Sequence, residues 1–145
     1  MTLACEGDLK DAAIRSTEIT LSPGCVRSGD FTVDTKTAGS VCLLIQTILP
    51  CLLYAPSRST LLLKGGTDAD FAPPVDFFRF TFLHYARLFG MGVSVERVLR
   101  GFNPKGCGEV GLSIEPLRCL TPVKITERGQ ITQITVSVYI CGTLP

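Results

Sequence analysis

One polar side chain stands out in the most apolar stretch of this sequence, because it could hold a ligand. Gln46 lies within VCLLIQTILPCLLYA, residues 41–55. A buried amide without a partner costs on the order of a few kcal/mol, so such a side chain needs a hydrogen-bond partner. Pro50 has no N–H, so a helix that runs through it leaves the carbonyl of Gln46 without its usual donor. Together these features indicate a ligand site, with an internal hydrogen bond from Gln46 to a neighbouring strand as the alternative.

Three further segments combine glycine, proline or lysine in ways that could serve a ligand. Gly65-Gly66 lacks the following Lys and Ser or Thr of a phosphate loop, which favours a turn between a strand and a helix. Pro73-Pro74 is typical of a helix start. Lys105 lies among glycines, which indicates a hairpin loop with positive φ. Taken singly, each segment is explained by local structure.

No residue is assigned as catalytic, and none as a metal ligand. The only histidine, His84, is spaced one helical turn from apolar residues on either side, as a packing or surface histidine would be. The seven cysteines contain no CxxC pair, so they lack the clustered spacing of a zinc site. We expect reduced thiols and an intracellular location, because residues 1–6 show no signal-peptide pattern. The expected compartment is the nucleus or alternatively the cytoplasm.

The composition indicates one folded domain of 145 residues. Only 19% of the residues are charged, which argues against disorder. The formal net charge of +1 gives no general basic surface, so RNA contact would need a local patch. A helix over residues 41–55 would extend about 22 Å, short of the roughly 30 Å core of a bilayer. This stretch therefore predicts a buried helix, and no membrane partner is expected.

The hydrophobic pattern predicts alternating strands and helices. Period-2 alternation and turn residues predict six short strands, at residues 18–22, 30–33, 60–64, 93–102, 109–115 and 131–140. The first helix is expected at about 38–54, with Thr35, Thr37 or Ser40 as its N-cap.

The second helix is expected from Pro73-Pro74 to about residue 89. Its apolar stripe consists of Phe78, Phe82, Tyr85 and Phe89, at α-helical spacing.

These elements predict an α+β fold of order β-β-α-β-α-β-β. Two helices on one face of a four-stranded sheet would bury both apolar stripes. The last strand, residues 131–140, has no helix after it. An open edge at that strand would invite pairing with another chain.

Four segments in series resemble the RNA 3'-terminal phosphate cyclase family. They are DTKTAGS (34–40) followed by Gln46, GGTD (65–68), APPVD (72–76) and RGFNPKGCGEV (100–110). The resemblance covers nearly the whole chain and implies the cyclase/enolpyruvyl transferase-like fold. Two positions depart from the family pattern, Cys107 in place of a glycine and Asn103 in place of an aromatic residue. A positive φ at Cys107 would cost about 1 kcal/mol or more.

The resemblance implies an ATP-dependent conversion of an RNA 3'-phosphate into a 2',3'-cyclic phosphate, a ligase-class reaction that uses Mg2+. Gln46 and Pro73 match the family residues that contact the adenine nucleotide. The family's nucleophilic histidine and its EGGGQ-type motif belong to segments that have no match here. We therefore expect a fragment that is inactive alone, with RNA 3' ends and ATP as the partners of the complete protein.

The resemblance also suggests how the chain is divided. We predict a partial N-terminal segment at residues 1–17, a β-α-β-α-β-β repeat unit at 18–116, and the incomplete start of a next unit at 117–145. One alternative function is that of a non-catalytic, cyclase-like protein of ribosomal RNA processing. The other is a truncated product without activity that associates through its unfinished sheet.

Overall fold

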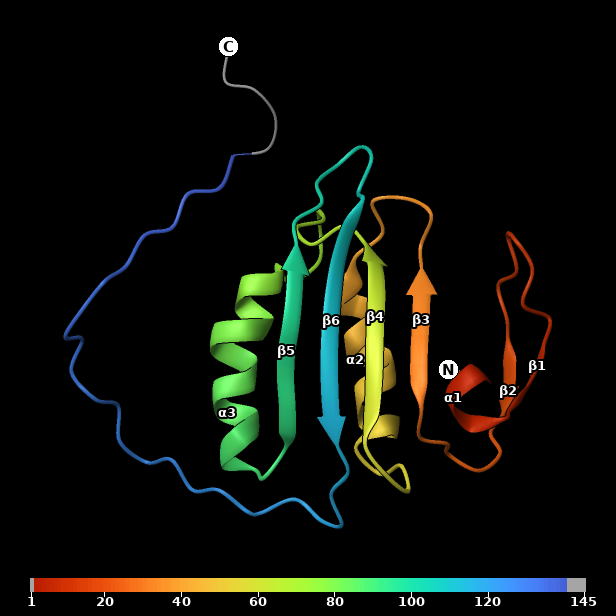
Figure 1. The fold of residues 1–145 in the computed structure, drawn as a ribbon, viewed down its shortest axis with the longest axis horizontal. Helices are drawn as coiled ribbons and strands as arrows, with labels where there is room; N and C mark the ends of the chain where they lie inside the picture. Colours follow the sequence, from red (N-terminus) through yellow and green to blue (C-terminus); the bar gives the residue numbers. More distant parts are fainter. Residues whose placement is uncertain (1, 141–145) are drawn as a thin grey trace.

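The computed structural model describes residues 2–140, and its centre is a four-stranded sheet with helices on one face (Figure 1). In spatial order, the strands are β3 (Asp30–Asp34), β4 (Ser59–Gly65), β6 (Gly108–Glu115) and β5 (Gly92–Leu99). Strand β3 runs parallel to β4, and β6 runs antiparallel to both β4 and β5. The predicted α+β class is confirmed.

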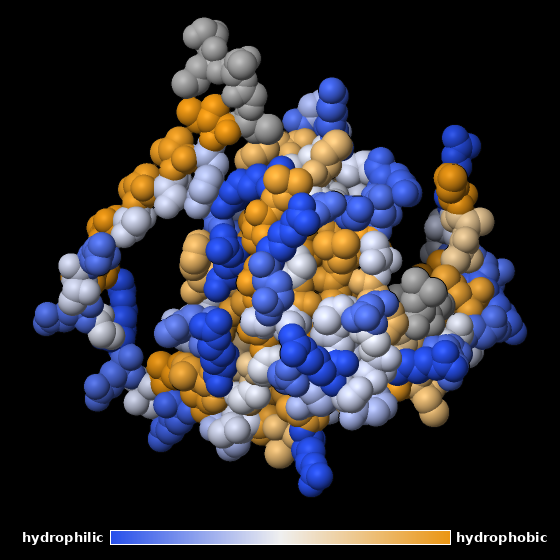
Figure 2. Space-filling view, viewed as in Figure 1, coloured by the Kyte–Doolittle hydropathy of each residue, from blue (hydrophilic) through white to orange (hydrophobic). Residues whose placement is uncertain are grey.

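The alternation of apolar residues in β6 buries one face of this sheet. Val110 lies opposite Leu63 of β4, and Leu112 lies opposite Leu61, all four at most 2% exposed. Because side chains alternate across a strand, the neighbouring residues point to the other face. That face is mostly polar, and hydrophilic side chains run across the strands there, with smaller hydrophobic areas between them (Figure 2).

Helix α2 (Val41–Leu52) lies behind β4 and β6 in Figure 1. Ser40 is its N-cap, and the N–H of Leu43 donates to Ser40 Oγ at 3.4 Å. The helix starts later than predicted because Ser40 still has extended φ and ψ angles of −66° and 120°. It continues through Pro50. Within the described residues, no helix has the length and apolar character needed to cross a membrane.

The second helical segment differs from the predicted α-helix. It consists of a π-helix, η1 (Phe77–Phe82), followed by α3 (Leu83–Leu88), and the N–H of Leu83 donates to the carbonyl of Phe78 five residues earlier. A π turn holds one more residue than an α turn.

This extra residue changes which side chains of the segment are buried. The buried stripe consists of Phe78, Leu83 and Ala86. Phe82 and Tyr85, which were predicted to be buried, are 38% and 48% exposed.

The N-terminal residues add a short helix and a second, two-stranded sheet, and Ala4 of the helix packs into the main hydrophobic core. Helix α1 (Thr2–Cys5) is followed by β1 (Asp8–Lys10) and β2 (Thr20–Ser22), which pair only with each other. The predicted strand at 18–22 is therefore present as β2 but lies outside the four-stranded sheet.

The prediction of a strand at residues 131–140 is wrong for this structure, which has no helix or strand between residues 116 and 140. Apolar side chains of this segment are exposed, between 63% and 81%: Ile131, Ile134, Val136, Val138 and Ile140. A strand needs a paired neighbour to satisfy its backbone groups, and the segment has none here. The guanidinium of Arg100 lies 3.4 Å from the ring centre of Tyr139, so the segment returns to the end of β5 (Figure 1).

Candidate functional site

The four motif segments meet at one end of the sheet, where β3, β4 and β5 end and β6 begins (Figure 1). We name this region the loop cluster, and it comprises residues 34–40, 65–76 and 100–108. The N–H of Gly66 donates to the carbonyl of Gly39 at 2.8 Å. The N–H of Thr67 donates to the carbonyl of Gly101, also at 2.8 Å. Backbone hydrogen bonds thus join all three parts of the cluster.

Glycines in the loop cluster allow very close backbone contacts. A Cβ atom on Gly101 would overlap the backbone N of Gly108 and the carbonyl O of Gly106. Gly106 has φ of +72°, and a Cβ there would overlap the backbone of Thr37. These glycines therefore serve backbone packing. The interpretation of Gly65-Gly66 as a turn is wrong, because Gly65 is the last residue of β4 and Gly66 forms a parallel β-bridge to Ser40.

Cys107 has φ of +58°, in the left-handed region that favours glycine. The strain expected from this departure from the family pattern is therefore present, at about 1 kcal/mol or more.

An ion-pair network joins three of the motifs. Arg100 Nη2 donates to Asp76 Oδ2 at 2.6 Å, and Arg100 Nη1 donates to Asp68 Oδ2 at 3.3 Å. Thr67 Oγ1 also donates to Asp68 Oδ2, at 2.7 Å. Burial lowers the pKa of Arg100, but the hydrogen bond to Asp76 and the charges of both carboxylates outweigh it, so the pKa is raised overall. Arg100 thus binds two carboxylates of its own chain.

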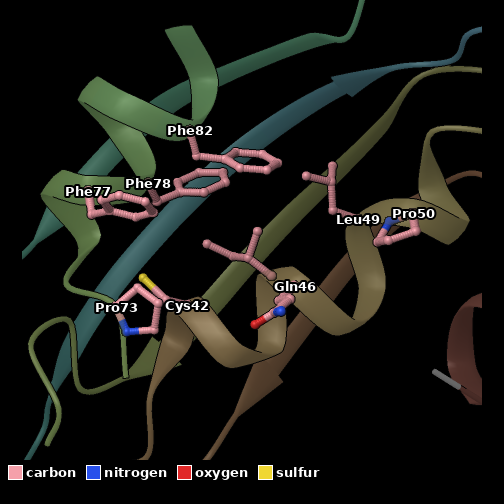
Figure 3. A pocket seen from close by; sticks show the side chains of 9 residues that line it. Cys42, Gln46, Leu49, Pro50, Pro73, Phe77, Phe78 and Phe82 are labelled. Carbon is pink, nitrogen blue, oxygen red and sulfur yellow. The ribbon is translucent and has the colours of Figure 1, made fainter. Parts of the chain in front are cut away.

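A groove lies beside the loop cluster, between α2 and η1 (Figure 3). Its volume is about 260 Å³, and it is lined by Cys42, Ile45, Gln46, Leu49, Pro50, Pro73, Phe77, Phe78 and Phe82. We call it the α2–η1 groove. Phe78 and Phe82 form one wall, where their rings stack with centres 5.4 Å apart and 18° between the planes. The groove is an apolar slot with one amide side chain.

That amide belongs to Gln46, whose side chain is exposed rather than buried. It makes no hydrogen bond to any other described residue, so the alternative of an internal bond to a strand is not seen. The premise that burial forces Gln46 to find a partner is therefore wrong. What the structure offers instead is a free donor and acceptor at the edge of an apolar groove (Figure 3).

Pro73 lies across the groove from α2, just before the helical segment that carries Phe77. The structure thus brings Gln46 and Pro73, 27 positions apart in the sequence, to one hollow. Their role in binding a nucleotide stays a prediction.

Cys42 lines the same groove with a thiol that stays protonated at neutral pH. Burial, together with the charge of Asp68, raises its pKa to about 11. A thiolate is the nucleophilic form of cysteine, so this side chain contributes an apolar surface rather than a reactive group.

Other candidates lie apart from the groove. His84 is exposed on α3 and meets only the edge of the Tyr85 ring among aromatic side chains of the described residues. In residues 2–140 there is no group of three or more Asp, Glu, His or Cys side chains that could hold a metal ion. Mg2+ at a nucleotide is usually held by one or two carboxylates together with the phosphates, so the expectation of ATP and Mg2+ stays a prediction.

Six of the nine groove residues were not assigned to a ligand site from the sequence: Cys42, Ile45, Leu49, Phe77, Phe78 and Phe82. The run Phe77-Phe78 is a usable signal, because two adjacent aromatic residues cannot both face the core of one helix.

The sequence of this chain is similar to those of known proteins. A sequence model of the family described as RNA 3'-terminal phosphate cyclase matches residues 1–142. An RNA 3'-terminal phosphate cyclase of Archaeoglobus fulgidus is 42% identical over 138 residues, which cover 95% of this chain and 41% of the relative. One of Pyrobaculum neutrophilum is 39% identical over 132 residues, covering 91% and 38%. The chain therefore spans about two-fifths of the length of these relatives.

Proposed function

The chain belongs to the RNA 3'-terminal phosphate cyclase family, and from this premise we propose that the α2–η1 groove binds the adenine base of ATP. The chain would then supply part of the nucleotide site of an enzyme that converts an RNA 3'-phosphate into a 2',3'-cyclic phosphate. The single observation that carries this proposal is the free amide of Gln46 at the edge of an aromatic-walled groove.

The chemistry of the lining suits a planar base. Aromatic rings offer stacking surfaces for any base, at about 1–3 kcal/mol for each stacked base. The amide of a glutamine can accept from the amino group of adenine and donate to a ring nitrogen beside it. Phe77 and Pro73 line the same groove as Gln46, so all three side chains can contact one base.

The size of the groove agrees with a base-sized ligand. Sites for small molecules have volumes of roughly 300–1,000 Å³. At about 260 Å³ the α2–η1 groove lies just below this range, which suits a base better than a whole nucleoside triphosphate.

The groove has no histidine that could form a covalent bond to AMP. The sequence holds one histidine, and His84 does not line the groove. We propose that this chain binds the nucleotide without forming a covalent adenylate. Incubation with labelled ATP and Mg2+ should leave no acid-labile AMP on the protein, and a stable label on His84 would contradict this part of the proposal.

Binding of adenosine tests the proposal directly. Gln46→Ala should weaken adenosine binding by about tenfold, as expected for the loss of one or two hydrogen bonds. Thr47→Ala is the matched control, since Thr47 follows in the same helix and its hydroxyl donates to the carbonyl of Leu43, away from the groove lining. Equal affinities for both variants and the parent chain, measured by isothermal titration calorimetry, would overturn the assignment of Gln46.

A further inference from the structure

We infer that the α2–η1 groove binds the nucleoside part of its ligand only, so that this chain distinguishes bases but does not distinguish the number of phosphates. The inference rests on the proposed function and makes it narrower. Adenosine, AMP and ATP would then be equivalent ligands of the chain.

The lining gives the first reason. None of its nine residues is charged, and Gln46 supplies its one amide. A phosphate placed among apolar side chains would lose its hydration without gaining a partner, which is strongly unfavourable. The phosphates of a bound nucleotide must therefore lie outside the groove.

The surroundings of the groove give the second reason. Of the hollows nearby, one beside α3 and one beside the start of α2 are not lined by Lys or Arg. The hollow beside α2 is lined by Asp70, a negative group. A phosphate that left the groove in that direction would meet a carboxylate.

The arginines near the start of the helical segment are already occupied. Arg100 binds the carboxylates of Asp76 and Asp68, so a phosphate could take it only by leaving both acids unpaired. Arg79 lies 3.6 Å from the other oxygen of Asp76, and its guanidinium is 4.9 Å from the ring centre of Phe80. Both guanidinium groups thus already face a carboxylate of the chain, whose charge a phosphate would have to compete with.

Most N–H groups in the first turn of α2 are already used within the chain. Free N–H groups at a helix start can bind phosphate. Here the N–H of Val41 donates to the carbonyl of Gly66, and those of Leu43 and Leu44 donate to the Oγ and carbonyl O of Ser40. The charge of Asp68 also reaches this turn, since it helps to raise the pKa of Cys42.

The test compares adenosine, AMP and ATP as ligands of the 145-residue chain by calorimetry, each with and without Mg2+. We expect three dissociation constants within about threefold of one another, with no effect of Mg2+ or of added salt. One charge-assisted hydrogen bond to a phosphate would change affinity by about tenfold or more.

The outcomes separate the two proposals. If ATP binds at least tenfold more tightly than adenosine, and Arg79→Gln or added salt removes the difference, the nucleoside inference is overturned while the groove assignment stands. If none of the three ligands binds, or if Gln46→Ala leaves all three affinities unchanged, the proposed function itself is overturned. Equal affinities that all fall in Gln46→Ala support both.

Discussion

The loop cluster and the α2–η1 groove lie side by side, yet their residues are used in opposite ways. In the loop cluster, glycines bring backbone segments together and Arg100 is held by two carboxylates. In the groove, side chains leave a hollow, and the amide of Gln46 has no partner. Most of the motif residues that reveal the family therefore build the scaffold, while the proposed ligand site consists mainly of ordinary apolar residues.

The largest effect should follow from Gly101→Ala in the loop cluster. The added Cβ would overlap the backbone of Gly106 and Gly108, which cannot move without breaking the start of β6. We expect a loss of about 3–5 kcal/mol in the free energy of unfolding, measured by denaturant titration. Gly129→Ala is the control, since a Cβ there meets no atom within 4 Å. Equal stability of the two variants would mean that the cluster is not tightly packed.

Breaking the ion-pair network should have the next largest effect. Arg100→Gln leaves Asp68 and Asp76 unpaired, and the arginine side chain is only 17% exposed, so we expect a loss of about 2–3 kcal/mol. Arg97→Gln removes a more exposed pair with Glu109 and should cost at most about 1 kcal/mol. Similar losses of unfolding free energy in both variants would show that the Arg100 network stabilises the chain no more than an exposed ion pair does.

Cys107→Gly should increase stability. Glycine relieves the strain of φ at +58°, and part of this gain is lost to the greater freedom of the unfolded chain. The net gain should be about 0.5–1 kcal/mol in denaturant titrations. Cys119→Gly, at an exposed position outside the left-handed region, should bring no gain. A loss in Cys107→Gly would mean that the thiol makes a contact worth more than the strain.

The smallest change in stability is expected in the groove. Phe77→Leu alters a half-exposed side chain and should change the free energy of unfolding by at most about 0.5 kcal/mol. Its affinity for adenosine should nevertheless fall by about fivefold or more through lost stacking. Phe80→Leu changes a more exposed ring on the same helix that does not line the groove, so its affinity should match that of the parent chain.

Local patterns in the sequence predicted several of the helices and strands correctly. The alternation of Val110, Leu112 and Ile114 identified β6, and Ser40 was among the predicted caps of α2. The π turn in η1 was missed because helical periodicity assumes 3.6 residues per turn throughout. The strand at residues 131–140 was wrong because strand pairing depends on a partner that local alternation cannot reveal.

The candidate site, too, could be predicted only in part from local patterns in the sequence. The series of motifs identified Gln46 and Pro73 as a pair, although the exposure of Gln46 was predicted incorrectly. The groove itself could not be predicted, because its walls come from two segments that meet only in the folded chain. Phe77 and Phe82 both belong to the π-helix η1, whose extra residue per turn changes the directions in which their side chains point.

Nuclear Overhauser contacts between bound adenosine and the chain test the central claim most directly. We predict contacts from the protons of the adenine ring to Phe77 and Pro73, and none to the loop residues around Gly106. Contacts that avoid both groove residues and fall on the loop cluster would contradict the account, because they would place the base among the scaffold residues.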